Sequence, residues 1–311
     1  MKAAIIHQSG SSDVLRLEDV PIPDLKPNKV LIRVHAAGVN PSDWKLRRGD
    51  FKLIPVKFPL ILGSECAGVV ERVGELVTSL RPGDRVVALL GHAGGGYADY
   101  AATDEERVIL LPDAISFTDG AAVPVTGITA LQALRDSAHA RPNDTVLVNG
   151  ASGGVGVMGV QIAQILGSTV TAVCSAGNAE LVRGLGAQRV IDYQTTDFTQ
   201  QTDLYDVIFD TIGNRSFGEC KHILTPDGTY VSPVPSAGLL AQAAITVFTS
   251  QKAKFIGAKD RGSDVQWLIE HMQQSTLRVV IDRTYPLAEV ARAHDYSETG
   301  RVRGKLVLSI A

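Results

Sequence analysis

The stretch Val146-Leu-Val-Asn-Gly-Ala-Ser-Gly-Gly-Val-Gly156 decides the fold of this chain. An apolar run leads into a glycine-rich turn whose Ala151-x-Gly153-x-x-Gly156 spacing matches the dinucleotide-binding fingerprint, with alanine at its first position. Such glycines permit a tight turn, close approach of the backbone to a pyrophosphate and close packing of a helix on a strand. Glycine loops also occur as ordinary turns, so the flanking sequence has to decide between the two interpretations.

The flanking sequence predicts a βαβ unit around this turn. We expect a strand over 145–149, a helix over 157–166 whose free N–H groups face the phosphate, and a second strand over 169–174. The same alternation continues through a helix at 179–185, strands at 189–192 and 205–210, a helix at 216–224 and strands at 228–231 and 254–257. Residues 120–257 are therefore predicted to form a doubly wound parallel sheet, the Rossmann type of α/β fold. The residues expected to contact the cofactor at the turn are Ser152, Gly153, Gly154, Val155 and Gly156.

Residues 1–119 have a different pattern, with short β-branched runs over 29–35, 66–74 and 84–90 between Gly and Pro turns. Many short strands with such turns favour a β-barrel or sandwich. The last part, 258–311, is expected to add a helix at 264–273, a strand at 277–282, a helix at 287–298 and a strand at 305–310. We interpret this order as a β domain interrupted by the nucleotide-binding insert and rejoined by the tail.

Composition excludes several classes of protein. The 311 residues are 45% hydrophobic and 20% charged, with a net charge of −3 and no run of like charges, so nucleic acid and anionic membranes are poor partners. No apolar run approaches the ~20 residues of a membrane span. The three cysteines, Cys66, Cys174 and Cys220, stand far apart and are interpreted as reduced thiols. We expect a cytoplasmic protein.

Eight motifs together carry a resemblance to a known family. They are Ala36-Ala-Gly-Val-Asn-Pro-Ser-Asp43, Gly63-Ser-Glu-Cys-Ala-Gly-Val-Val70, Val77–Arg85, Val125-Thr-Gly-Ile-Thr129, Asn149–Gly156, Ile191-Asp-Tyr193, Asp210-Thr-Ile-Gly213 and Gly300-Arg-Val-Arg-Gly-Lys305. The chain resembles the zinc-free, quinone-oxidoreductase-like branch of the medium-chain dehydrogenase/reductases, and looks most like the alkenal/one reductases and the reticulon-interacting reductases. The resemblance implies a GroES-like β-barrel catalytic domain with an inserted Rossmann domain.

Zinc ligands of the metal-dependent relatives are missing from this sequence. Those relatives carry a first-loop Cys, a Gly-His-Glu motif and a four-Cys lobe, whereas this chain has Ser42 in a loop without Cys, Ser64 before Glu65, and no Cys after Gly91 in the lobe segment. A catalytic zinc needs about three N, S or O protein ligands. We therefore expect no metal, and a structural hydrogen bond or ion pair for Glu65.

The cofactor expected is NADPH. An NAD site places an acidic residue at the end of the second strand, but here that strand leads into Cys174-Ser175-Ala-Gly-Asn178. Ser175 and Asn178 can donate to a 2′-phosphate, and Tyr193 resembles the family tyrosine that lines the same pocket. No Arg or Lys occurs in 174–178, and both polar residues could instead cap the helix that follows.

Five further residues are candidates for the reaction centre. Thr126 resembles the family threonine at the nicotinamide end, although it could be a helix cap, and Ile212 follows a strand end that should line the ligand crevice. By resemblance, Asn40 and Lys45 flank a loop that faces the nicotinamide. Asn40 would donate an amide hydrogen bond to the nicotinamide or the substrate, and Lys45 would place a positive charge near a developing enolate or the cofactor. Both could instead serve the turn and the solvent. Tyr97, after three glycines, is a candidate wall of the substrate pocket.

These features predict a zinc-independent, NADPH-dependent reductase of quinones or of the C=C bond of α,β-unsaturated carbonyls. Hydride addition to a conjugated acceptor spreads charge over an enolate, for which modest hydrogen-bond donors can suffice. The alternatives are a catalytically idle NADPH-binding redox sensor or structural partner, and a zinc alcohol dehydrogenase. The expected partner is a small-molecule acceptor, and a homodimer is the candidate assembly.

Overall fold

The computed structural model describes residues 1–51, 56–91 and 94–310, which form two compact units. The first unit combines residues 1–125 with 260–311, and the second contains residues 126–259. The sequence placed these boundaries at 119/120 and 257/258. In the described residues no helix has the length and apolar character needed to cross a bilayer.

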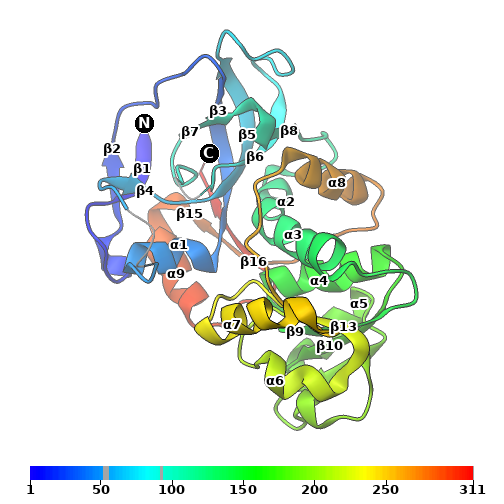
Figure 1. The fold of residues 1–311 in the computed structure, drawn as a ribbon. Helices are drawn as coiled ribbons and strands as arrows, with labels where there is room; N and C mark the ends of the chain where they lie inside the picture. The colour runs from blue at the N-terminus through cyan, green and yellow to red at the C-terminus, as the bar shows by residue number, and fades with distance from the viewer. Residues whose placement is uncertain (52–55, 92–93, 311) are drawn as a thin grey trace. The chain divides into compact units, whose positions relative to one another are not determined.

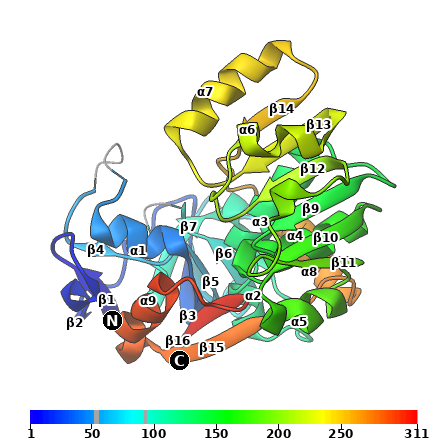
Figure 2. The ribbon, with the colours of Figure 1, turned by 90° about the horizontal axis from the view of Figure 1, so that it is seen from below.

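The second unit is built on a six-stranded sheet in which every neighbouring pair is parallel (Figure 2). Its strand order is β11-β10-β9-β12-β13-β14. The strands are β9 (Thr145–Asn149), β10 (Thr169–Cys174), β11 (Arg189–Asp192), β12 (Tyr205–Asp210), β13 (Leu224–Ser232) and β14 (Lys252–Phe255). The connecting helices are α4 (Gly154–Ile165), α5 (Ala179–Gly184), α6 (Phe217–Cys220) and α7 (Ala237–Ile245). Helix α3 (Pro124–Leu131) and the π-helical turn η4 (Gln132–Ala138) precede β9.

The chain order reverses its direction along this sheet between β9 and β12. Residues on both faces of the central strands are buried, such as Val146 and Leu147 on β9 and Val207 and Ile208 on β12, which explains the continuous apolar runs of the sequence. In such sheets ligands bind outside the carboxyl ends of the strands, where the order reverses. Asn149 and Asp210 end these two strands and are direct partners in the parallel ladder. In this fold, a ligand is therefore expected at the loops that follow Asn149 and Asp210.

The first unit contains a seven-stranded sheet and a three-stranded sheet (Figure 1). The larger sheet has the order β15-β16-β3-β5-β6-β8, with β7 also paired to β3, and the smaller has the order β2-β1-β4. Their strands are β1 (Lys2–Ile6), β2 (Arg16–Asp19), β3 (Lys29–Val39), β4 (Leu60–Ile61), β5 (Glu65–Val73), β6 (Arg85–Leu89), β7 (Tyr100–Asp104), β8 (Val108–Leu110), β15 (Ile281–Pro286) and β16 (Lys305–Ser309). The two ends of this unit's sequence thus meet in one sheet, because β16 pairs with β3.

Helices of the first unit include α1 (Pro41–Arg48), α2 (Phe117–Ala121), α8 (Gly262–Gln273) and α9 (Val290–Glu298). Helix α1 begins directly after β3, with Asn40 between them, and Pro41 suits the first helical turn because its missing N–H would have no partner there. Asp43 completes the helix start, since its Oδ2 accepts from the Asn40 backbone N–H at 2.8 Å. This local sequence therefore turns the chain sharply at the end of a central strand.

Candidate functional site

The glycine-rich turn after β9 has the geometry that the fingerprint predicts. Gly150 has φ +77°, and Gly153 donates its N–H to the Gly150 carbonyl at 3.0 Å before α4 begins. A Cβ on Gly156 would lie 2.1 Å from the Gly150 oxygen, so only glycine allows the helix to pack this closely on the turn. Ser152 and Val155 lie within the same turn and first helical residues. The start of α4 thus fits a pyrophosphate held by backbone N–H groups.

Two of the residues assigned to a 2′-phosphate pocket, Ser175 and Asn178, are joined by hydrogen bonds to each other and to Ser152 of the glycine-rich turn. Asn178 donates from Nδ2 to the Ser152 hydroxyl oxygen at 3.0 Å and to the Ser175 hydroxyl oxygen at 3.3 Å. Because both serines accept from Asn178, each keeps its own hydroxyl proton for another acceptor. Neither Ser175 nor Asn178 makes a side-chain cap hydrogen bond, so capping alone does not account for them.

Two charged residues, Asp192 and Arg183, lie near the end of β10. Burial raises the pKa of the Cys174 thiol, Asp192 raises it further, and Arg183 opposes the rise, which places both charges close to the end of β10. Asp192 is the ladder partner of Cys174, and its Oδ1 accepts from the Gln194 backbone N–H at 3.0 Å. Tyr193, the next residue, is exposed. The end of β10 is thus influenced by one acidic and one basic group, Asp192 and Arg183.

The turn after β12 packs directly against the glycine-rich turn. A Cβ on Gly150 would lie 2.6 Å from the Ile212 side chain and 2.6 Å from the Thr211 hydroxyl oxygen. Ile212 itself is exposed. The structure therefore places Ile212 beside the turn assigned to the cofactor. Thr126, in contrast, is buried on α3, and its predicted contact with the nicotinamide end stays a prediction.

A buried ion pair forms at Glu65, in the motif Gly63-Ser64-Glu65 that by resemblance corresponds to the Gly-His-Glu motif of zinc relatives. Lys305 Nζ donates to Glu65 Oε1 at 2.9 Å, Asn40 Oδ1 at 2.6 Å and the Val39 carbonyl at 3.2 Å, so its three protons have three acceptors. Glu65 Oε2 accepts from the Val125 backbone N–H at 2.7 Å. Lys305 and Glu65 are 2% and 0% exposed. The structural role expected for Glu65 is confirmed.

Asn40 belongs to this buried network. Its Nδ2 donates to Glu65 Oε1 at 2.8 Å, its Oδ1 accepts from Lys305, and the residue is only 2% exposed. One of the two Nδ2 protons is therefore committed to Glu65. The donor role predicted for Asn40 depends on the other proton. Lys45 lies on α1 and is half-buried, with Nζ 5.5 Å from the centre of the Trp44 ring.

A second buried network starts at Asp43 and corrects the interpretation of Tyr97. The Asp43 carboxylate accepts from the Ser64 hydroxyl at 2.8 Å and from the Tyr97 hydroxyl at 2.9 Å, and Tyr97 is 0% exposed. The prediction that Tyr97 lines a substrate pocket is wrong, because its ring is enclosed in the core. His294 Nε2 lies 3.4 Å from the Tyr97 hydroxyl, and Arg47 Nη1 lies 3.4 Å from His294 Nδ1.

Burial shifts the pKa values of Asp43 and His294, the two ends of this network, in opposite directions. It raises the pKa of Asp43 to about 6, although the hydrogen bonds from Asn40, Ser64 and Tyr97 act against the rise. Burial and the neighbouring Arg47 lower the pKa of His294 to about 3. His294 is thus neutral at pH 7 and accepts from Arg47 at Nδ1, so that its Nε2–H faces Tyr97. Tyr97 in turn donates to Asp43.

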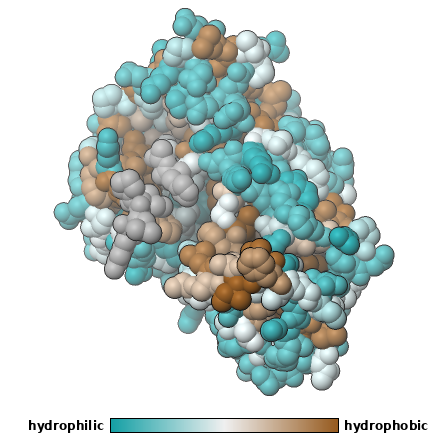
Figure 3. All heavy atoms as spheres, in the orientation of Figure 1, coloured by the Kyte–Doolittle hydropathy of each residue, from teal (hydrophilic) through white to brown (hydrophobic). Residues whose placement is uncertain are grey.

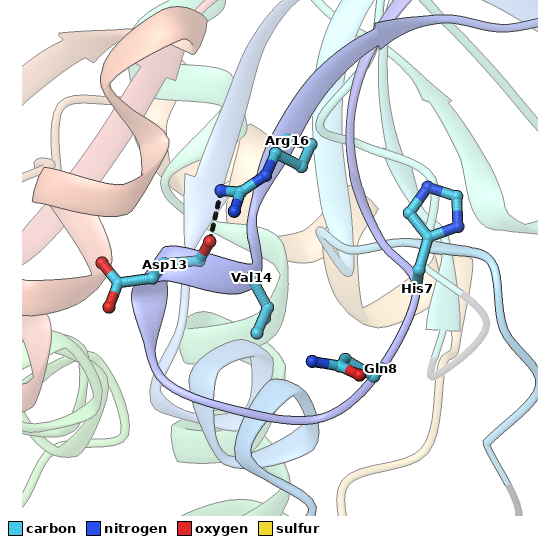
Figure 4. Close-up of a pocket in the computed structure, with 5 residues that line it drawn as sticks. All are labelled: His7, Gln8, Asp13, Val14 and Arg16. Carbon is cyan, nitrogen blue, oxygen red and sulfur yellow. Dashed lines mark hydrogen bonds between the residues drawn. The ribbon is translucent and has the colours of Figure 1, made fainter.

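A shallow pocket elsewhere on the first unit contains none of the predicted site residues (Figure 4). It is lined by His7, Gln8, Asp13, Val14 and Arg16. Arg16 donates to the Asp13 carbonyl at its edge, and His7 pairs with Glu18 at 3.0 Å. The Asp13 carboxylate accepts from the Ser11 hydroxyl at 3.2 Å, so the charged groups of this pocket have partners of their own.

Comparison with known proteins identifies the family. Models of the alcohol dehydrogenase GroES-like domain and of the zinc-binding dehydrogenase match residues 26–113 and 185–308. The chloroplast envelope quinone oxidoreductase homolog of Arabidopsis thaliana is 31% identical over 96% of this chain and 95% of its own length. The chain belongs to the quinone-oxidoreductase-like branch of the medium-chain dehydrogenase/reductases.

Two further members of this family extend the comparison. The NADPH-dependent alkenal/one oxidoreductase of Arabidopsis thaliana is 32% identical over 99% of this chain and 79% of its own length. The solved quinone oxidoreductase of Coxiella burnetii superposes with a TM-score of 0.92, at 31% identity, over 100% of this chain and 99% of that one. The GroES-like and Rossmann fold class and the oxidoreductase family predicted from the sequence are confirmed. The medium-chain fold therefore accounts for both units.

Proposed function

We propose that the chain is an NADPH-dependent, zinc-independent reductase that transfers hydride to quinones or to the C=C bond of α,β-unsaturated carbonyls. The observation that carries this proposal is the Lys305–Glu65–Asn40 network. It occupies the region of the family's zinc ligands with a buried ammonium group, which is bonded to the one carboxylate of the Gly63-Ser64-Glu65 motif. Named relatives that act on quinones and on alkenals or enones support the acceptor class.

The chemistry of the donor set supports zinc independence. Glu65 uses both oxygens for hydrogen bonds, and Ser42 and Ser64 are poor zinc ligands compared with Cys and His. Within residues 1–51, 56–91 and 94–310, no three His, Cys, Asp or Glu side chains are grouped so that they could hold a metal ion. A zinc ion would also have to displace the Lys305 ammonium, whose positive charge repels it.

The second unit would hold NADPH at its glycine-rich turn and at the Ser152–Ser175–Asn178 cluster. When bound, NADPH supplies the hydride, and the protein supplies orientation and electrostatics. Neutral serine hydroxyls at this position can donate to a 2′-phosphate and do not repel it, as a carboxylate there would. In the first unit, Asn40 is proposed to donate an amide hydrogen bond that positions the nicotinamide or the substrate. Lys45 is proposed to place a positive charge near the developing enolate or the cofactor.

The cofactor part of the proposal is tested by Ser175→Asp. A carboxylate at this position repels a 2′-phosphate, so NADPH affinity should fall by about tenfold or more, which corresponds to ~1.4 kcal/mol, while NADH affinity is retained. Ser236→Asp is a matched control, because Asp also caps the start of α7 well. Wild-type protein that uses NADH as well as NADPH would contradict the phosphate pocket.

The acceptor part is tested by steady-state NADPH oxidation with enones, enals, quinones and simple ketones, before and after treatment with a chelator. We expect turnover with conjugated acceptors, none with simple ketones, and full activity after chelation with well under one zinc per chain. Zinc that is stoichiometric and required would indicate the zinc alcohol dehydrogenase. Absence of turnover with every acceptor would favour the idle NADPH-binding protein, which the same nucleotide site would serve.

The proposed assembly is a homodimer in the cytoplasm. Cys66, Cys174 and Cys220 are all free and buried, which suits a reducing compartment. Apolar side chains gather over α7 in Figure 3. They include Leu240, Ile245, Val247 and Phe248, of which Phe248 is 92% exposed. Strand β14, next to this helix, pairs only with β13 among the described strands, so one of its edges is open to a second copy.

A further inference from the structure

Three neighbouring strands of the larger sheet, β16, β3 and β5, bring Asn40, Glu65 and Lys305 together. Asn40 directly follows β3, Glu65 begins β5, and Lys305 begins β16. Leu306 is the antiparallel ladder partner of Val39, so the residue before it on β16 lies opposite the residue that follows β3. Backbone pairing within one sheet therefore fixes the places of these three residues.

The carboxylate of Glu65 is held at both of its oxygens. Oε2 accepts from the Val125 backbone N–H at 2.7 Å. Oε1 lies close to the backbone of β3, because a Cβ on Gly38 would be 2.1 Å from this oxygen and 2.6 Å from the Ala121 carbonyl oxygen. Only glycine at that position leaves room for the carboxylate. Oε1 is thus the oxygen that serves the other two members of the cluster.

The amide of Asn40 contacts two opposite charges, and each charge selects one end of the amide. Oδ1 accepts from the Lys305 ammonium group at 2.6 Å, whereas Nδ2 donates to Glu65 Oε1 at 2.8 Å. Turning the amide over would bring its NH2 group against the ammonium group and its oxygen against the carboxylate. Both contacts are repulsive, and the three residues are at most 2% exposed, so water does not screen the charges. The ion pair therefore selects one orientation of the amide.

This orientation decides which atom Asn40 can offer to a ligand. An amide nitrogen carries two N–H donors, and Nδ2 uses one of them on Glu65 among the hydrogen bonds of the described residues. The group that remains at this end of the amide is an N–H donor. In the reversed orientation the same end would be the carbonyl oxygen, which presents a lone pair. The charges of Lys305 and Glu65 thus make this end of Asn40 a donor.

We propose that Lys305 and Glu65 are positioning residues, which hold the Asn40 amide so that it donates an N–H to the oxygen of a conjugated carbonyl acceptor and does not present its own oxygen there. This inference rests on the donor role of Asn40 in the proposed function and deepens it by naming the acceptor oxygen. An N–H donor stabilises the negative charge that hydride addition places on that oxygen, whereas a carbonyl lone pair would repel it. Lys305 and Glu65 act through Asn40 and do not touch the acceptor.

The double variant Glu65→Gln/Lys305→Met tests the selection without leaving one buried charge alone, which would be strongly destabilising. The Val125 N–H keeps an oxygen acceptor in this variant, so the new amide nitrogen faces Asn40 and reverses its amide. We expect turnover with an enone to fall by about 10²-fold, the usual effect of losing one such donor, while NADPH affinity stays within about twofold of wild type. Full turnover in this variant would overturn the inference.

Asn40→Ala shows whether the ion pair acts through Asn40. This variant alone should lose about 10²-fold in turnover, and adding Glu65→Gln/Lys305→Met should lower turnover by no more than about threefold further. Independent losses that multiply to about 10⁴-fold would count against positioning and overturn the inference. Unchanged turnover in Asn40→Ala would contradict the donor role in the proposed function as well, which separates the two failures.

NMR of labelled asparagine side chains reads the amide orientation in the protein without cofactor. The signals of Asn40 are those that disappear in Asn40→Ala. In wild type, the proton that donates to Glu65 should resonate well downfield of the other, because a carboxylate is a strong acceptor. This separation should collapse in Glu65→Gln/Lys305→Met. Equal separations in the two proteins would show that the ion pair does not select the orientation.

Lys29→Met/Asp104→Asn is the control for the loss of an ion pair from the same sheet. Lys29 begins β3 and Asp104 ends β7, and their charged groups lie 3.4 Å apart at the end of β3 remote from Asn40. We expect this variant to keep both the turnover and the separation of the Asn40 signals. A loss of either would reveal a general effect of removing an ion pair and overturn the specific role of Lys305 and Glu65.

Discussion

Lys45 is the half-buried cation in the last turn of α1, and two substitutions test it. If it stabilises the charge that develops on an acceptor, Lys45→Ala and Lys45→Met should lower turnover by about 10²-fold, the usual effect of losing one such donor. NADPH affinity should be measured separately. Arg48→Met is the control, because Arg48 lies on the same helix at the same 5.5 Å from the Trp44 ring and is exposed. Unchanged turnover in both Lys45 variants would assign Lys45 to the solvated surface.

The pair Asp43 and His294 should leave opposite signatures in the pH dependence of stability. Because the pKa of Asp43 rises from 3.8 to about 6 on folding, the folded state binds its proton first. Its stabilising contribution is complete below pH 3.8 and is lost as the pH rises through 6. The pKa of His294 falls from 6.5 to about 3, so its contribution is lost as the pH falls below 6.5. Between pH 6 and pH 4, the two groups therefore change the free energy of unfolding in opposite directions, and their pH dependences cancel.

The variant Asp43→Asn removes the contribution of Asp43 to the pH dependence of stability and keeps that of His294. From pH 6 to pH 4, the free energy of unfolding of the variant should fall relative to wild type by about 1.4 kcal/mol per pH unit, or about 3 kcal/mol in total. Urea unfolding of both proteins across this range measures the difference. Parallel curves would show that Asp43 is already protonated, or not perturbed, in the folded protein.

At the residue scale, motif position selected side chains that lie together in the structure, while their roles in cofactor binding stay predictions. Ser152, Ser175 and Asn178 were chosen by motif position, and the structure joins them by hydrogen bonds. The partner of Glu65 could not be found in this way, because Lys305 lies 240 residues away and no spacing links them. Tyr97 was misjudged for a related reason, since its buried acceptor Asp43 comes from another element.

At the scale of elements, the strands of the parallel sheet were predicted closely and the helix starts less well. Helix α4 begins at Gly154, three residues before the predicted start, because its phosphate-binding turn needs glycines that have low helix propensity. Strand β15 covers 281–286 and not 277–282, since its register is set by pairing with β16, a contact with no local signal. Helix α7 was not predicted, and its apolar, partly exposed sequence lacks a clear amphipathic period.

Gly156→Ala tests how tightly α4 must pack on the glycine-rich turn. Its Cβ would meet backbone atoms of Gly150 and Ala151 at 2.1 and 2.7 Å, which cannot rotate away. We expect a loss of about 1–3 kcal/mol in the free energy of unfolding, together with weaker NADPH binding. Gly238→Ala on α7 is the control, because nothing lies within 4 Å of its Cβ. A variant as stable as wild type would mean that the turn can move apart from the helix.

For the whole molecule, the exposed side chain of Phe248 offers the test of the proposed homodimer. An aspartate at this position would place a charge in an apolar contact between two copies. We expect wild type to sediment at twice its 33.1 kDa chain mass and Phe248→Asp to sediment as a single chain with unchanged unfolding temperature. Thr249→Asp is the control one residue away. A wild-type protein that sediments as a single chain would contradict the assembly.

The pairing of β16 with β3 also determines the order in which the chain can fold as it is synthesised. Strand β3 lies between β16 and β5 in its sheet, yet β16 begins at Lys305, 276 residues after β3 begins at Lys29. The second unit is continuous in sequence. It can therefore complete its sheet before the last strands of the first unit have been synthesised. We expect the nascent chain to carry a finished nucleotide-binding unit before the first unit closes. During that interval, the edge of β3 over Ala36–Val39 has no partner, because β7 covers only Lys29–Arg33, and this open segment is the part that incorrect partners could reach.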